Sequence, residues 1–336
     1  MNSKDHIVYD HIRKHFFALV GIVLAGFVTS CLSFLLPVSI GEFFSLQFQT
    51  GGSKSKLFSL LGIHLQTTTQ FYLLFIVFLI LRALLNFLET AGNYRQGELF
   101  VKALREKIFA SQISWPPALL SKGSYGKYLL RYSSDMKSVQ NYFTRGIMEG
   151  IKNLLFLLTG LFILSQINPM LTGMLVSILL TSMVAVYFIA KYQKPAIRSS
   201  RSDRSSLLAY VSKSFAAFGK IQLRGAEVKT IEGFNERSHK LFTSNKHSNR
   251  IESLIQSCIH LLIFIMIGIL LWQMSMPYSR ISAGDGLMMI LIILMMQGSL
   301  RKILKVPGYL NKGNISLQKI SKLLHPPQRY DQVSFA

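Results

Sequence analysis

Long runs of apolar residues alternate with polar, basic stretches along the whole chain. A helix needs about 20 apolar residues to cross the roughly 30 Å hydrocarbon core of a membrane. Six stretches reach or approach that length, so the pattern predicts six membrane-spanning helices. They cover residues 16–40, 71–88, 147–167, 170–192, 254–276 and 287–304.

Two polar inserts are long, and each follows directly from a predicted span. From Gln70 to about Ser111 nothing stops a helix before the sequence Trp115-Pro116-Pro117. A helix of that length measures about 63 Å, twice the hydrocarbon thickness. The second insert repeats the arrangement, with a turn after about Tyr210 and a returning helix. We therefore predict an all-α polytopic membrane protein with six long transmembrane helices and two cytoplasmic helical hairpins.

The composition supports a membrane protein, because half of the 336 residues are hydrophobic and only 15% are charged. The net charge of +22 could indicate a nucleic-acid partner. Most of the 37 lysines and arginines, however, lie in the N-terminal segment, the two hairpins and the tail after Arg301. Cytoplasmic segments of membrane proteins are enriched in this way. We predict no nucleic-acid partner, a cell (inner or cytoplasmic) membrane location, and cytoplasmic N- and C-termini.

Catalytic chemistry is not evident in the sequence. A phosphate-binding loop needs Gly-x-x-x-x-Gly-Lys followed by Ser or Thr, but the Gly-Lys pairs at Gly126 and Gly219 are followed by Tyr and Ile. A polar cluster suited to a lipid-modifying enzyme is not apparent either. His11 and His15 share a helical face, and without a third ligand we interpret them as a solvated interfacial face. We predict that the chain is not an enzyme by itself and holds no metal or cofactor.

Three stretches, taken in their order and spacing, resemble the transmembrane domain of ABC exporters of the six-span, long-hairpin type. The likeness covers about residues 16–324. The positions that carry it are Gly126, Leu130, Arg131 and Asp135 in the first hairpin, Ile221, Gly225, Ala226, Glu227 and Phe234 in the second, and Gly284, Asp285, Ser316, Lys319 and Ile320 in and after the sixth span. The chain departs from the family pattern at Lys213, Ala217, Gln222, Ser299 and Pro307.

The resemblance implies a transmembrane domain over residues 1–324 and a linker over 325–336 with no nucleotide-binding domain. It implies a permease subunit that works by alternating access with a second transmembrane subunit, identical or different, in a lipid membrane. A nucleotide-binding (ATPase) subunit on another polypeptide would hold ATP and Mg. Two alternatives remain open: the transmembrane half of a fused exporter whose ATPase domain is missing, and a membrane scaffold or receptor that does not transport.

The resemblance also implies that the hairpin tips are coupling helices that contact the ATPase. Aromatic and apolar groups at a polar tip favour a partner that buries them. Alternatively, these groups pack against their own hairpins. The candidates are Trp115, Pro116, Leu119, Leu120, Gly123 and Tyr125 in the first tip, and Ser214, Phe215, Phe218 and Ile221 in the second.

Arg82 lies about midway along the second predicted span, where a charge is costly enough to suggest that it faces a cavity. With Asn86 one turn further, it could meet an anionic group of a substrate. Alternatively, Arg82 pairs with Glu89 or with a backbone carbonyl. Glu149 and Lys152 are three residues apart, and we predict that they pair with each other. The sequence does not identify the substrate.

Overall fold

The computed structural model describes residues 3–48, 68–115, 131–276 and 281–324. Within these ranges the chain is helical apart from short connections, and it contains no strand. The predicted all-α class is therefore confirmed. The chain divides into two compact units, one formed by Met1–Met170 with Leu270–Ala336 and one formed by Leu171–Ile269. We describe each unit by itself.

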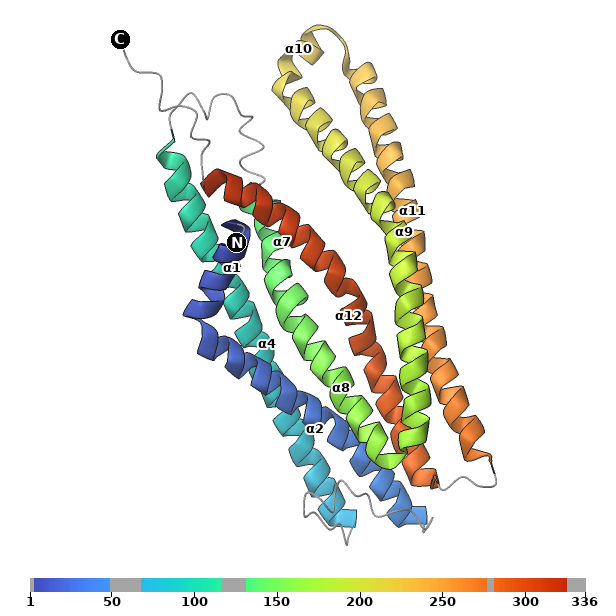
Figure 1. Cartoon of the computed structure of the whole chain (residues 1–336). Helices are drawn as coiled ribbons and strands as arrows, with labels where there is room; N and C mark the ends of the chain where they lie inside the picture. The colour runs from blue at the N-terminus through green and yellow to red at the C-terminus, as the bar shows by residue number, and fades with distance from the viewer. Residues whose placement is uncertain (1–2, 49–67, 116–130, 277–280, 325–336) are drawn as a thin grey trace. The chain divides into compact units, whose positions relative to one another are not determined.

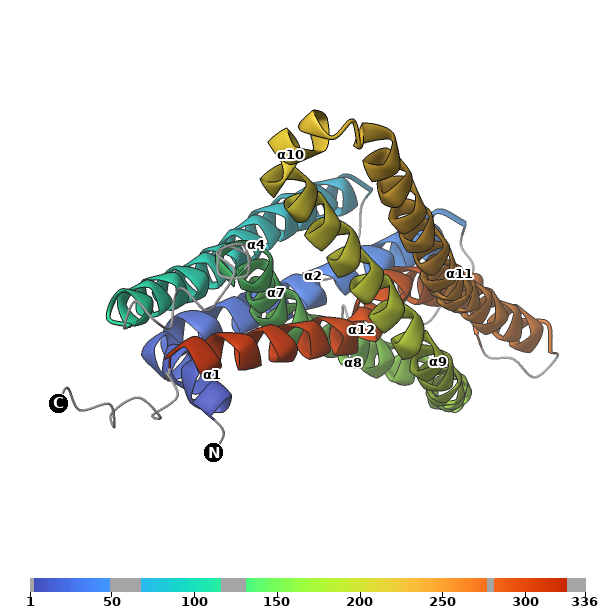
Figure 2. The same cartoon turned by 90° about the horizontal axis from the view of Figure 1, so that it is seen from above.

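Four long helices lie side by side in the first unit, with a short helix at its N-terminal end (Figures 1 and 2). The central helix α2 packs against α4, α8 and α12, and α12 also packs along the segments that lead into α8. Two of those segments, η1 and η2, are π-helical, a rare geometry that is often found at functional sites. The bounds are α1 Ser3–Lys14, α2 Phe16–Phe48, α4 Thr68–Ile113, η1 Arg131–Asp135, α7 Met136–Asn141, η2 Tyr142–Met148, α8 Glu149–Ile167 and α12 Ala283–Leu324.

A cluster of buried apolar residues joins the far end of α4 to the end of α12. Apolar residues three or four apart on α4 face the same direction, and they meet apolar residues of α7, η2 and α12. The fully enclosed members of this cluster include Phe100, Leu104, Ile108, Val139, Phe143 and Ile320. This core fixes α12 beside the first hairpin.

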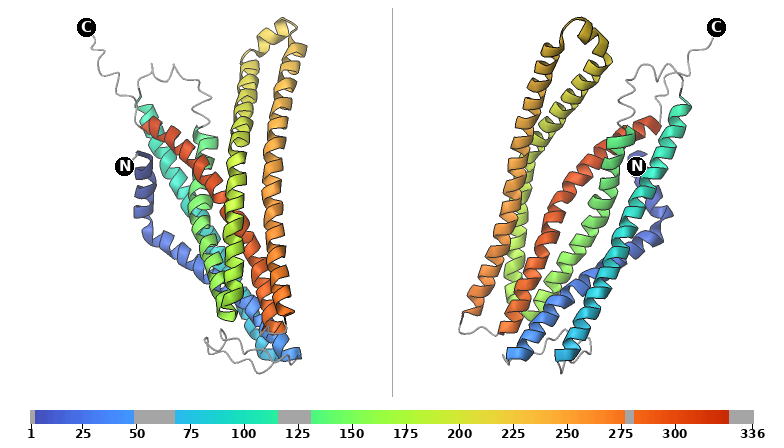
Figure 3. Two further views of the ribbon diagram at one scale, coloured as in Figure 1. Left: turned by 45° about the vertical axis from the view of Figure 1, so that its right-hand side comes forward. Right: turned by 180° about the vertical axis from the view of Figure 1, so that it is seen from behind.

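The second unit is a helical hairpin. Its two long helices, α9 (Pro169–Ala216) and α11 (Glu227–Met274), have 48 residues each and lie side by side, and the short α10 (Phe218–Leu223) closes the turn (Figure 3). Hydrogen bonds cross the hairpin from Ser200 to Asn245 and from Ser244 to Asp203, both 2.5 Å long. The turn into α11 passes through Gly225, whose φ of 57° is easily reached only without a side chain.

The predicted spans and the helices of the structure agree closely, with two differences. Within the described ranges, five helices are long and apolar enough to cross a membrane, and α9 adds a shorter apolar segment, Pro169–Thr181. The fourth predicted span, residues 170–192, therefore stays a prediction. Sequence reasoning placed His11 and His15 on a helical face but gave no bounds for α1. The hairpin helices are continuous with apolar sequence as predicted, since α4 and α9 run without a break from apolar into basic sequence and α11 runs without a break from basic into apolar sequence.

Candidate functional site

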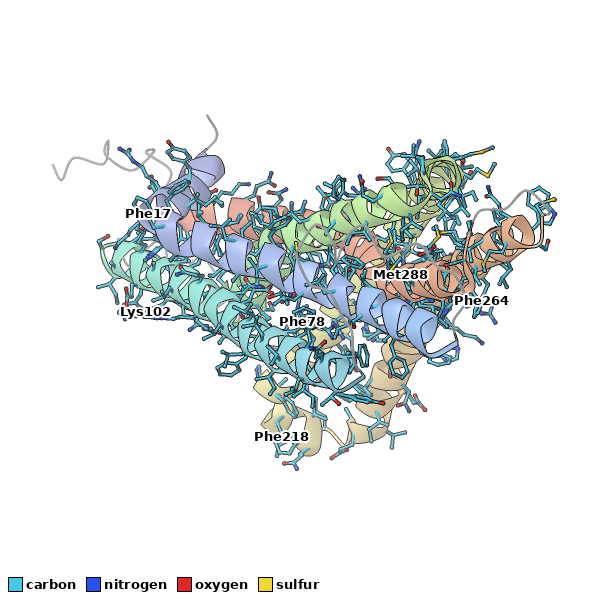
Figure 4. The ribbon with its side chains drawn as sticks, turned by 90° about the horizontal axis from the view of Figure 1, so that it is seen from below. Phe17, Phe78, Lys102, Phe218, Phe264 and Met288 are labelled. Atoms are coloured by element: carbon cyan, nitrogen blue, oxygen red, sulfur yellow. The ribbon has the colours of Figure 1, made fainter. Side chains whose placement is uncertain are left out.

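The tip of the second hairpin exposes large apolar side chains. Phe215 at the end of α9 is 73% exposed and Phe218 on α10 is 56% exposed. Figure 4 places Phe218 on the short helix that closes the hairpin. Ser214 and Ile221 are half-buried. Neither phenylalanine is packed away against its own hairpin, and Leu223, which sequence reasoning missed, is 89% exposed beside them.

Most of the first tip lies outside the described residues. That holds for Pro116, Leu119, Leu120, Gly123 and Tyr125. Trp115 is described: it is half-buried, and its backbone N–H donates to the carbonyl of Gln112 at 3.2 Å just after α4 ends. A role for these six residues in contacting an ATPase therefore stays a prediction.

Asp135 joins the first hairpin to α12. Its Oδ1 accepts a hydrogen bond of 2.8 Å from the Ser316 hydroxyl, and its other oxygen forms an ion pair with Arg131 one turn earlier. Both Asp135 and Ser316 are buried. Sequence reasoning singled out all three residues from the family resemblance but did not predict that they meet.

Small residues bring α12 close to the first hairpin. A side chain at Gly313 would collide with the Cβ of Tyr142, and one at Gly146 would lie 2.9 Å from the Cδ2 of Leu310. Further along, the Ser111 hydroxyl donates to the carbonyl of Leu323 at 3.0 Å. The end of α12 is thus held against both helices that lead to the first tip.

Arg82 is half-buried between α4 and α2. Its Nε donates to the hydroxyl of Ser33 at 2.9 Å, and Ser33 in turn donates to the carbonyl of Thr29 at 2.7 Å. The alternative in which Arg82 pairs with Glu89 is wrong, because Glu89 has another partner. Asn86, one turn further along α4, is exposed.

Glu89 and Lys152 form an ion pair between α4 and α8, with 2.6 Å between Oε2 and Nζ. The predicted pairing of Lys152 with Glu149 is therefore wrong. The Glu89 side chain is only 7% exposed, and a buried carboxylate attracts the lysine more strongly than an exposed one does. Gly26 of α2 lies close to that carboxyl group, since a Cβ there would be in ordinary van der Waals contact with it at 3.4 Å.

His11 is buried rather than solvated, so that interpretation is wrong. Its ring centroid lies 4.8 Å from that of Phe100 and 5.3 Å from that of Phe143, and 4.7 Å from that of His15. Burial, and to a smaller extent the charges of His15 and Lys14, together lower the pKa of His11 from 6.5 to about 4. Within the described ranges, no group of three or more His, Cys, Asp or Glu residues is placed to hold a metal ion.

Comparison with known families agrees with this geometry. Residues 19–300 match the model of the ABC transporter transmembrane region. The chain belongs to this family. Membership confirms the resemblance found in the sequence, and together with the apolar helices it establishes a multi-pass membrane protein.

Relatives of this ABC transporter transmembrane region include larger proteins. This chain is 20% identical over 245 residues to an "ATP-dependent lipid A-core flippase" of Pseudoalteromonas translucida (strain TAC 125). The match covers 72% of this chain and 42% of that protein. It is 20% identical over 256 residues to the protein of the same name from Nitrosococcus oceani, covering 75% and 42%. It is 22% identical over 253 residues to YknV of Bacillus subtilis (strain 168), an uncharacterized ABC transporter ATP-binding protein, covering 74% and 39%. The chain thus spans about two fifths of the length of these relatives.

Proposed function

We propose that this chain is the permease subunit of an ATP-driven exporter, and that its hairpin tips transmit the movements of a separate ATPase to the spans. Two such transmembrane subunits would enclose a pathway that opens alternately to either side of the membrane. The observation that carries this proposal is the apolar surface of Phe215, Phe218 and Leu223 at the second tip. Apolar groups of this size on a polar hairpin outside the spans favour a protein partner.

The contacts of Asp135 support the mechanical part of the proposal. A force on the first tip would reach α12 through the hydrogen bond to Ser316 and through the close approach of Gly313 to Tyr142. These contacts are short and buried, so the first hairpin and the end of α12 resist separation. The ATP and Mg would lie on the partner, and the chain would be placed in the cytoplasmic membrane with both termini in the cytoplasm.

For the cargo, we propose an amphipathic lipid with an anionic group. Two relatives are named lipid A-core flippases, and Arg82 offers a cation within the span region whose position is fixed by Ser33. Asn86 would add a hydrogen-bonding group one turn away. Transport of such a lipid should fall strongly in Arg82→Gln and much less in Arg82→Lys, because the lysine keeps the charge.

The deciding experiment isolates the tagged chain from its native membrane and identifies the ATPase that accompanies it. In the reconstituted complex, we expect Phe218→Ala to abolish substrate-stimulated ATP hydrolysis while the chain still inserts. Leu208→Ala is the matched control, since Leu208 is 54% exposed on α9 of the same hairpin but about 11 Å before Phe215 along the helix axis. Equal loss in both variants, or full coupling in Phe218→Ala, would overturn the assignment of the tip.

The same isolation separates the alternatives. An ATPase domain found on the same polypeptide would identify the transmembrane half of a fused exporter. A chain that accompanies no ATPase and shows no ATP-driven lipid movement in proteoliposomes would instead be a membrane scaffold or receptor.

A further inference from the structure

A groove of about 700 Å³ runs along one face of α11. The described residues that line it carry two cations, Lys246 and Arg250, two amides and two serine hydroxyls, with no acidic side chain among them. All of these groups can donate hydrogen bonds, so the lining is suited to an anion. The amides and hydroxyls belong to Asn245, Asn249, Ser253 and Ser257.

The groove lies where the fifth span begins. The apolar run of α11 starts at Leu254, so Arg250 lies about 6 Å and Lys246 about 12 Å before it along the helix axis. The headgroup layer of a bilayer is about 5–8 Å thick on each side. Arg250 therefore lies at headgroup level, and the long Lys246 side chain can reach the same level.

The groove continues into an exposed apolar stripe on the same helix. Leu254, Leu261 and Phe264 are between 59% and 66% exposed. Leu254 lies three residues before Ser257, and Leu261 and Phe264 lie four and seven residues after it, so all of them share one face of the helix. Figure 4 shows Phe264 on α11. One face of the helix thus changes from cationic to apolar at the level where a lipid changes from headgroup to acyl chain.

We propose that this groove binds the phosphate headgroup of an anionic membrane phospholipid. Arg250 and Lys246 contact the phosphate, the neighbouring amides donate to its remaining oxygens, and an acyl chain lies along Leu261 and Phe264. Basic pockets at the edge of membrane spans recognise anionic lipids in this way. The inference does not depend on the proposed transport function.

The test measures binding of a fluorescently labelled phosphatidylglycerol to the full chain in a zwitterionic detergent. A cation near an anionic lipid surface contributes a factor of about five in affinity, so the double variant Lys246→Gln, Arg250→Gln should bind roughly 25-fold more weakly. The matched control is Arg198→Gln, Arg204→Gln, which removes the same charge from exposed positions on α9 of the same hairpin. We expect the control to bind like the unchanged chain.

Two further binding measurements identify the ligand. Labelled phosphatidylcholine should bind roughly tenfold more weakly than phosphatidylglycerol, and inorganic phosphate should not displace the anionic lipid. Equal weakening by the control variant would show diffuse attraction and overturn the site. Displacement by inorganic phosphate would show a free-anion site and overturn the assignment to lipid. Because Arg250→Lys keeps the charge, full binding by that variant is expected and would show that the fold is intact.

Discussion

The hydroxyl of Ser316, near the end of α12, donates a 2.8 Å hydrogen bond to the buried carboxylate of Asp135 in the first hairpin, 181 residues earlier in the chain. Because Arg131 pairs with the other oxygen of the same carboxylate, Asp135 is held from two sides. A hydrogen bond to a charged group in a buried site is stronger than one between neutral groups. The contact therefore links two parts of the chain that sequence alone places far apart.

A double-mutant cycle measures this link. We expect Asp135→Ala and Ser316→Ala to show a coupling energy of about 1.5–3 kcal/mol, the range for hydrogen bonds to charged groups. The measurement is unfolding of the purified chain by SDS in mixed micelles. Ser321→Ala is the control, since the Ser321 hydroxyl is exposed and bonds only to the Gln318 carbonyl of its own helix. A coupling energy near zero would mean that the contact does not hold α12 in place.

The Glu89–Lys152 ion pair is expected to contribute far more than an exposed pair. Lys152→Ala leaves the buried carboxylate of Glu89 unpaired and should cost about 3–5 kcal/mol of unfolding free energy. Lys102, labelled in Figure 4, pairs with Glu106 on the surface, with both side chains more than 60% exposed, so Lys102→Ala should cost less than about 1 kcal/mol. Unfolding by SDS measures the loss of unfolding free energy in both variants. Similar costs for both would contradict the burial of the Glu89 pair.

The close approach of α12 to η2 predicts opposite effects at two glycines of the same helix. Gly313→Ala places a methyl group against the Cβ of Tyr142, which cannot move without its backbone, so we expect a loss of about 1–3 kcal/mol. At Gly308 nothing lies within 4 Å of an added Cβ, and Gly308→Ala should stabilise the helix by about 0.5–1 kcal/mol. Thermal unfolding in detergent measures both the expected loss of stability in Gly313→Ala and the expected gain in Gly308→Ala. A neutral Gly313→Ala would place the two segments further apart than described.

The buried His11 makes the docking of α1 sensitive to acid. Its folded pKa of about 4 lies below the ordinary value of 6.5, so the unfolded or undocked form binds the extra proton between these values. Stability is therefore full above about pH 6.5 and falls as the pH drops toward 4, by at most about 3 kcal/mol. The protection factors of the α1 amides, in which the pH dependence of the intrinsic exchange rate is removed, should fall over that window.

His11→Phe supplies the test of that titration, because a phenyl ring can pack against Phe100 and Phe143 but cannot be protonated. Exchange in this variant should be independent of pH once the intrinsic rate is removed. His247→Phe, at an exposed position on α11, should keep the acid response of the unchanged chain. An acid response that persists in His11→Phe would assign the effect to another group.

Much of the fold follows from the sequence because apolar length and helix stop signals are local properties. The start of α4 and its end before Trp115 were predicted to within about two residues, and α9 and α11 leave their apolar runs as continuous helices. The bounds and the packing of the N-terminal α1 were not predicted, since its apolar residues Val8 and Ile12 matter only through their contact with the buried core of the first unit. No periodicity over so short a segment shows that contact.

The partners of the charged residues could not be predicted in the same way. Spacing along one helix suggested that Lys152 would pair with Glu149, but the buried Glu89 of a different helix competes more strongly. Likewise, Arg82 meets Ser33 rather than Glu89, because the register between α2 and α4 decides which side chains face each other. Such registers depend on packing between helices, which the sequence of either helix alone does not contain.

Helix α11 runs for 48 residues without a proline. A straight helix of that length is a rod of about 72 Å, so a tilt of about 5° about one end displaces the other end by about 6 Å. A sideways displacement of that size exceeds half of the 8–10 Å that separates the axes of packed helices. Modest angular changes at the end of α11 near Phe218 could thus give side chains at the far end different neighbours, with no bond in the rod broken.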